Sequence, residues 1–124
     1  MKTEVPEIQQ SLIDLLKKEF PVLRASKDNE KVFETTGTIP AMQGKQKVEG
    51  HYFASIMPKP KDVRLYFFPI YTHVDAFADI SPELRKFLKG KSCFHIKKLS
   101  PEIETEIQAM IRKGVELYQA DGLI

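Results

Sequence analysis

The sequence has only three histidines and one cysteine, side chains well suited to binding a transition metal or to nucleophilic catalysis, and they are scattered. The three histidines, His51, His73 and His95, stand 22 residues apart. Three imidazoles converging with Cys93 on one sheet face would form a transition-metal site. Because no two of them have the short local spacing of paired ligands, we expect surface or hydrogen-bonded histidines and predict no metal site.

A catalytic nucleophile would have to be the single cysteine, Cys93. Cys93 and His95 are two residues apart on a predicted strand, so they share a face and a contact is feasible. A lone cysteine in a strand is more often a small buried hydrophobe. Gly37, Gly44 and Gly50 are too dispersed to form a phosphate-binding loop. We therefore predict a protein that is not an enzyme, with an undetected enzyme as an alternative.

Basic residues form the clearest charge feature. The cluster consists of Arg85, Lys86, Lys89, Lys91, Lys97 and Lys98. Together with nearby aromatic residues it predicts a ligand-binding site in which a basic rim surrounds an aromatic floor. The predicted site residues are Tyr66, Phe68, Tyr71, Lys91 and Lys97. Such a site would hold a small anion or an acidic protein partner. The common alternative is a solvated edge whose lysines prevent sheet-to-sheet aggregation.

The elements that must position these residues are indicated by hydrophobic spacing and by turn residues. Apolar residues at helical spacing predict a helix over residues 6–20 and a longer one beginning at Ser100-Pro101 and ending before Gly122. Strands are predicted over residues 31–39, 48–57, 63–70 and 92–97, and a short helix after Ser81-Pro82. In the second strand, Tyr52, Ala54 and Ile56 should share one face. Gly114, within the last helix, suggests that another backbone passes close.

The resulting order is α-β-β-β-α-β-α, which predicts an α+β fold of one domain over residues 1–124. We expect a two-layer sandwich whose mostly antiparallel sheet has four to five strands and is packed against N- and C-terminal helices. The strand at 63–70 is apolar on both faces, so it should be central and covered on both sides. Aromatic residues buried in this way could not stack on bases, so we do not expect nucleic-acid binding.

Composition agrees with these expectations. The chain has 124 residues, 42% hydrophobic, and a net charge of +2, which is too small to indicate a nucleic-acid or membrane-surface protein. One cysteine excludes an internal disulfide, the first residues do not resemble a signal peptide, and no stretch has the length of a membrane helix. We therefore expect a cytoplasmic protein with no membrane partner.

Three segments in combination resemble the YdhG-like family of small bacterial proteins. They are Thr36-Gly37-Thr38-Ile39-Pro40-Ala41, Leu65-Tyr66-Phe67-Phe68-Pro69, and residues 88–98 followed by Ser100-Pro101-Glu102. The resemblance covers residues 8 to 118 and implies a compact α+β domain. The chain departs from the family pattern in the Gly-to-Pro interval, which is one residue longer, and at Met42, where the family usually has an aromatic residue.

The resemblance also implies an alternative function, because some members are described as frataxin-like iron chaperones. Iron ions favour oxygen ligands, and Glu102 and Glu106 lie one turn apart on the predicted last helix, with Glu104 nearby. Acidic residues at a helix start more commonly stabilise the helix dipole. We therefore expect a non-catalytic ligand- or protein-binding module, with an iron-binding chaperone as the alternative.

Overall fold

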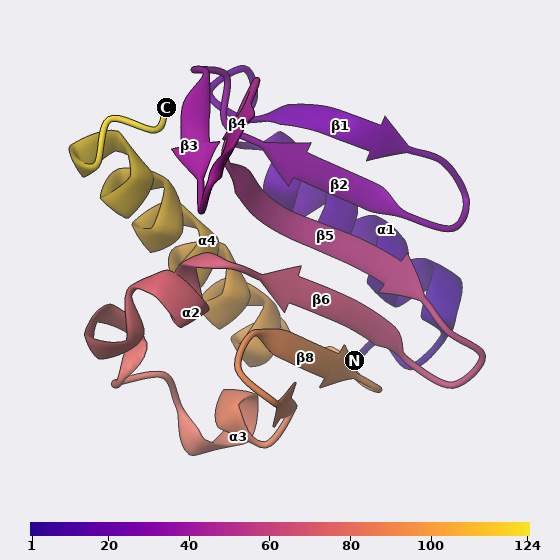
Figure 1. Ribbon diagram of the computed structural model, residues 1–124. Coiled ribbons are helices and arrows are strands. Elements are labelled where there is room, and N and C mark those ends of the chain that lie inside the picture. The colour runs from indigo at the N-terminus through magenta and orange to yellow at the C-terminus, as the bar shows by residue number, and fades with distance from the viewer.

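The computed structural model describes residues 1–124, and its framework is an antiparallel sheet with two long helices on one face (Figure 1). The six strands of this sheet are β1 (Arg24–Asp28), β2 (Phe33–Thr36), β5 (Tyr52–Pro58), β6 (Val63–Phe67), β8 (Cys93–Ile96) and β7 (Leu88–Lys89), in spatial order. A separate hairpin consists of β3 (Ala41–Gln43) and β4 (Gln46–Val48). The helices are α1 (Val5–Lys17), α2 (Pro69–Thr72), α3 (Pro82–Arg85) and α4 (Pro101–Ala120), with a 3₁₀ turn, η1, at Val74–Phe77. The predicted α+β class and the terminal helices are confirmed.

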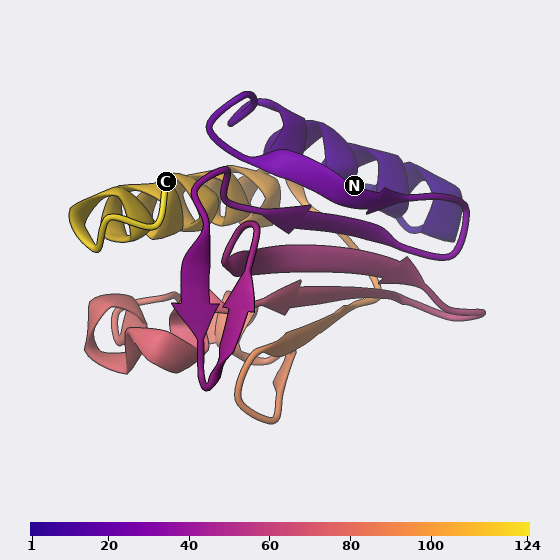
Figure 2. The same ribbon diagram turned by 45° about the horizontal axis from the view of Figure 1, so that its top comes forward.

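Helices α1 and α4 form where the apolar spacing predicts them. In α1, Ile8, Leu12 and Leu16 are fully buried along one stripe. The Ser100 hydroxyl accepts a hydrogen bond from the Ile103 N–H, as an N-cap residue should. Figure 2 shows both helices on the same side of the sheet, where they cover the hydrophobic core. This layer leaves the opposite side of the sheet without a long helix.

The central strands show how the two faces of the sheet differ. On β6, Val63, Leu65 and Phe67 are fully buried against the helices, whereas Arg64 and Tyr66 between them are partly exposed. The prediction of a strand covered on both sides is therefore wrong. The strand is apolar on both faces because Tyr66 and the following Phe68 contribute aromatic surface to the second face, not because a second layer covers it.

The strand count and several boundaries also differ from the prediction. The sheet has six strands and the hairpin two, instead of four to five in all. Residue 48 belongs to the β3–β4 hairpin, and β5 begins only at Tyr52. The strand predicted to continue to Ile70 ends at Phe67, because Pro69 begins α2. The observed order therefore contains more elements than α-β-β-β-α-β-α.

A local irregularity between β2 and β5 changes which face Tyr52 occupies. The pairing shifts between Thr35 and Thr36, so that Thr35 pairs with Ala54 but Thr36 pairs with Tyr52. Phe53, skipped in the register, is fully buried. Tyr52 therefore lies beside Phe68, with 5.5 Å between the ring centroids, and not in the core with Ala54 and Ile56.

Candidate functional site

An apolar pocket with charged residues at its edges is built by the segment that links β6 to β8. Ser81 caps α3 by accepting a hydrogen bond from the Leu84 N–H, which confirms the predicted helix start. The Glu106 carboxylate on α4 accepts hydrogen bonds from both the Ser81 N–H, at 2.7 Å, and the Ser81 hydroxyl. Phe77 and Leu84 are buried below. This anchoring holds α3 opposite α2 and η1, and leaves a hollow between them.

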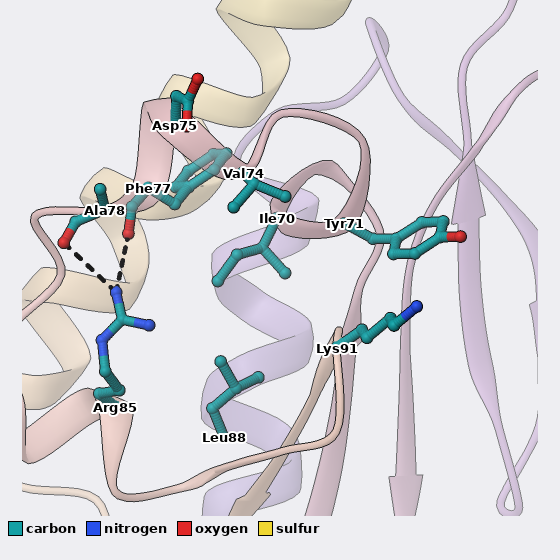
Figure 3. Close-up of a pocket in the computed structure, with 9 residues that line it drawn as sticks. All are labelled: Ile70, Tyr71, Val74, Asp75, Phe77, Ala78, Arg85, Leu88 and Lys91. Carbon is teal, nitrogen blue, oxygen red and sulfur yellow. Dashed lines mark hydrogen bonds between the residues drawn. The ribbon is translucent and has the colours of Figure 1, made fainter.

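The hollow has a volume of about 480 Å³, within the range typical of small-molecule sites. Its floor and walls are mainly apolar, and it has charged residues at its edges (Figure 3). The lining residues are Ile70, Tyr71, Val74, Asp75, Phe77, Ala78, Arg85, Leu88 and Lys91. Val74, at 64% exposed, and Tyr71, at 47%, are large apolar or aromatic side chains that the fold leaves open to solvent here.

Two cations stand on different sides of this hollow. The Arg85 Nη2 donates to the backbone carbonyls of Phe77, at 3.2 Å, and Ala78, at 3.4 Å, which fixes the guanidinium at one edge. Because a guanidinium has five N–H donors, about three of them remain for a ligand. Lys91 Nζ lies 5.5 Å from the centroid of the Tyr71 ring on the other side (Figure 3). An anion in the hollow would meet a positive charge at either edge.

The structure brings together only part of the predicted site. Tyr71 and Lys91 are in contact at the hollow. Phe68 lies next to Tyr71, with 5.6 Å between the ring centroids, but Phe68 and Tyr66 do not line the hollow. Lys97 follows β8, whereas Lys91 precedes it, so the two lysines lie at opposite ends of that strand. Lys91 therefore lies at this hollow, and Lys97 lies outside it.

Lys97 instead lines a separate, polar hollow of about 400 Å³ near the β5–β6 turn. Its other lining residues are Lys59, Pro60, Lys61, Asp62 and Arg64. The Asp62 carboxylate accepts a hydrogen bond from Arg64 Nε at 2.9 Å, and its side chain is only 8% exposed. The exposed groups of this hollow are therefore chiefly cationic.

Cys93 and His95 share the face of β8 that the helices do not cover. Cys93 pairs with Tyr66, and His95 pairs with Arg64, on the neighbouring strand. Burial raises the pKa of the Cys93 thiol, an effect that the adjacent Tyr66 and Arg64 oppose. A raised pKa keeps the sulfur protonated at neutral pH and lowers its reactivity, since the thiolate is the nucleophile. The geometry therefore does not favour nucleophilic chemistry at Cys93.

The three histidines have different surroundings. His51 lies against Tyr118, with ring centroids 5.3 Å apart and Nδ1 3.2 Å from the tyrosine oxygen. His73 Nε2 is 2.8 Å from the Asp121 carboxylate at the end of α4. His95 lies on β8. No group of three or more histidine, cysteine or acidic side chains is placed to hold a metal ion.

The acidic residues of α4 that iron binding would use take part in other contacts. The Glu106 carboxylate accepts two hydrogen bonds from Ser81, and Glu104 forms an ion pair with Lys2 at 3.0 Å. Glu102 is exposed in the first turn, where an acidic side chain stabilises the helix dipole. Glu102 and Glu106 thus have different environments in spite of their spacing.

Two sets of residues were not found by reading the sequence. The apolar lining of the pocket comes from Ile70, Val74 and Leu88, of which Ile70 was expected to lie in a strand. The exposed Val74 between short proline-initiated helices is the signal that could have indicated a cavity.

Thr72, His73 and Asp121 form a hydrogen-bonded chain, with both contacts at 2.8 Å, that ties α2 to the end of α4. His73 and Asp121 are 48 residues apart, so the sequence contains no local sign of this contact.

No protein-family model, curated protein or solved structure matches this chain. The resemblance to the YdhG-like family therefore stays a prediction made from the three quoted segments. None of the helices combines the length and the apolar character needed to cross a membrane.

Proposed function

We propose that this protein is a non-catalytic binding module whose pocket between α2, η1 and α3 takes a small organic anion with an apolar body. The observation that carries the proposal is the position of Arg85 and Lys91 on different sides of an apolar hollow. Pockets of this kind bind their ligands through apolar burial, while a few polar groups fix orientation. The single cysteine agrees with our expectation that the module acts in the cytoplasm.

The polar groups favour a carboxylate or a sulfonate over a neutral ligand. The two carbonyl contacts hold Arg85 in place before any ligand arrives, which lowers the conformational entropy lost on binding. The apolar lining, formed by six of nine residues, suits an aromatic or branched aliphatic body. Asp75, also at the pocket edge, would repel a ligand with several negative charges. The ligand class proposed is therefore a monoanion.

The test is a titration of the ¹⁵N-labelled protein with 1-naphthoate, followed by amide chemical shifts. We expect saturable shifts for residues 70–78 and 85–91, and much smaller shifts with the neutral 1-naphthalenemethanol. Arg85→Gln should weaken naphthoate binding about tenfold or more, because a hydrogen bond to a charged group contributes about 1.5–3 kcal/mol.

The matched control is Lys86→Gln. It removes the same charge from the next residue in the sequence, the C-cap of α3, which does not line this pocket. Equal binding by the Arg85→Gln and Lys86→Gln proteins would overturn the proposal, as would equal shifts with the neutral alcohol. Shifts that never saturate would also overturn it, since they would describe a surface without a site.

A further inference from the structure

The uncovered side of the sheet has a composition that the pocket does not explain. We define the open face as the side chains of Glu34, Tyr52, Ser55, Met57, Arg64, Tyr66, Phe68, Lys89, Cys93 and His95. Helices α1 and α4 both lie on the other side of the sheet (Figures 1 and 2). All of these residues except Ser55 are partly or fully exposed.

Tyr66 lies at the centre of the open face between two small residues. Its partners across the strands are Ser55 on β5 and Cys93 on β8. A large ring flanked by small side chains has no bulky neighbour directly across either strand to cover it. The pKa of Tyr66 is raised, first by partial burial and then by the neighbouring Cys93, which agrees with a ring close to the sheet surface. The Tyr66 side chain is therefore partly exposed on this face.

The aromatic surface extends from Tyr66 toward the pocket. Phe68 follows the end of β6 and is the N-cap residue of α2. Phe68 lies beside both Tyr52, at 5.5 Å, and Tyr71, at 5.6 Å, between ring centroids. Open antiparallel sheets that present aromatic side chains in this way can stack two or three bases.

Positive charge lies along the β6–β8 side of this aromatic row, whereas Glu34 on β2, which pairs with Ser55, places an acidic group on the other side, near Tyr52. His95, on β8, has its pKa lowered first by burial and then by Arg64; Asp62 opposes this effect, and Lys89 and Lys97 add to it. These cations therefore lie close enough to act on one side chain of the open face. Lys59 and Lys61 add to the charge in the hollow beside Arg64. The one acid there, Asp62, is almost fully buried and is paired with Arg64.

We propose that the open face binds single-stranded nucleic acid, with bases stacked on Tyr66 and Phe68 and phosphates held by Lys59, Lys89 and Lys97. Aromatic stacking combined with cations that follow the backbone is the general mode of sequence-tolerant single-strand binding. The expectation of no nucleic acid had two reasons, a strand covered on both sides and the small net charge of +2; the partly exposed Arg64 and Tyr66 remove the first, and the second predicts weak binding. The inference goes beyond the proposed small-anion function and uses different residues.

The test is fluorescence anisotropy with a fluorescein-labelled oligothymidine of about ten nucleotides, a length within the usual site size. Because the net charge of the chain is only +2, we expect sequence-independent binding of about 10⁻⁴ to 10⁻⁶ M at moderate salt. Three phosphate contacts predict a slope of roughly −2 for log K against log salt concentration. An oligomer of abasic sites with equal charge should bind at least about fivefold more weakly, because it lacks bases to stack.

Two variants probe the two contributions separately. Tyr66→Ala should weaken oligothymidine binding about fivefold or more, and should hardly affect the abasic oligomer. Lys97→Gln, a fully surface change, should weaken both oligomers and reduce the salt slope by about 0.7. Lys18→Gln, which removes the same charge at the end of α1 on the other side of the sheet, is the matched control. Thermal melting of each variant establishes that it is folded.

Each result bears on the proposal. No binding of either oligomer, or equal binding of both, overturns it; the second result would describe an anion-attracting surface only. Equal effects of Lys97→Gln and Lys18→Gln also overturn it. Arg85→Gln should leave oligothymidine binding unchanged, so that a failure of the small-anion proposal is distinguishable from a failure of this one.

Discussion

At the scale of single residues, the pKa of His95 depends on the charged groups of the open face. Burial lowers the pKa of this imidazole, and Arg64 on the neighbouring strand lowers it further. Both effects disfavour the imidazolium form in the folded state. Since the folded pKa is below the unfolded value of about 6.5, the folded protein should lose stability as the pH falls from about 6.5 through the folded pKa.

We predict that the imidazole protons of His95 titrate by NMR with a midpoint below about 6.5. Arg64→Gln should move this midpoint upward, because a positive charge paired directly with His95 is removed. Added salt should move it in the same direction by screening the exposed lysines. Lys18→Gln serves as a control that should leave the titration unchanged. A His95 midpoint at or above about 6.5 would contradict this account of the surface charge. So would a midpoint that is the same in the wild-type and Arg64→Gln proteins.

At the scale of elements, the packing of α4 on the sheet depends on Gly114. The prediction that a backbone passes close to this glycine is wrong. A β-carbon there would instead lie 2.8 Å from Phe67 Cζ and 3.2 Å from Phe53 Cζ, both on buried rings. The absence of a side chain allows the helix to approach two phenylalanines of the central strands.

Gly114→Ala is therefore expected to destabilise the protein although alanine favours helix formation by about 1 kcal/mol. Overpacking a well-filled core costs about 1–3 kcal/mol, so we predict a net loss of about 1 kcal/mol in the free energy of unfolding measured in urea. Gln108→Ala, at an exposed position of the same helix, should change it by less than about 0.5 kcal/mol. A more stable Gly114→Ala protein would show that the rings can move aside without cost.

The sequence predicted the elements whose apolar spacing extends over several turns or a full strand. Helix α4, capped by Ser100 and closed before Gly122, was predicted with nearly the correct limits. Strand β1 is mostly exposed at the sheet edge, and β3 and β4 have three residues each, so none has enough alternation to be recognised.

The residues of the predicted site are brought together only in part, because of distance and of tertiary contacts that the sequence does not indicate. Lys91 and Lys97 are near in sequence but are separated by an extended strand, roughly 20 Å at about 3.3 Å per residue. Arg85 was recognised only as a member of a basic cluster. Its position depends on carbonyl groups of η1 that no sequence pattern brings to it.

At the scale of the whole molecule, the segment of residues 69–91 packs on the sheet-and-helix framework through buried Ile70, Phe77 and Leu84. It contains three very short helical turns and has two polar links to α4, one from His73 to Asp121 and one from Ser81 to Glu106, of which the second holds the α3 end. Local structure of this kind can open at a lower free energy than global unfolding. The pocket is built from this segment, so its geometry should depend on the link from Ser81 to Glu106.

Glu106→Ala should therefore release the segment while leaving the framework folded. We expect faster hydrogen exchange of the amides in residues 82–89, and slower, nearly unchanged exchange in β5 and β6, measured by mass spectrometry or NMR. The same variant should weaken 1-naphthoate binding, since Arg85 loses its fixed position. Glu102→Ala, which removes an exposed acid from the same helix, is the matched control. If Glu106→Ala instead raised exchange uniformly across the sheet, the segment would belong to the same cooperative unit as the core, and the pocket would be as rigid as the strands beneath it.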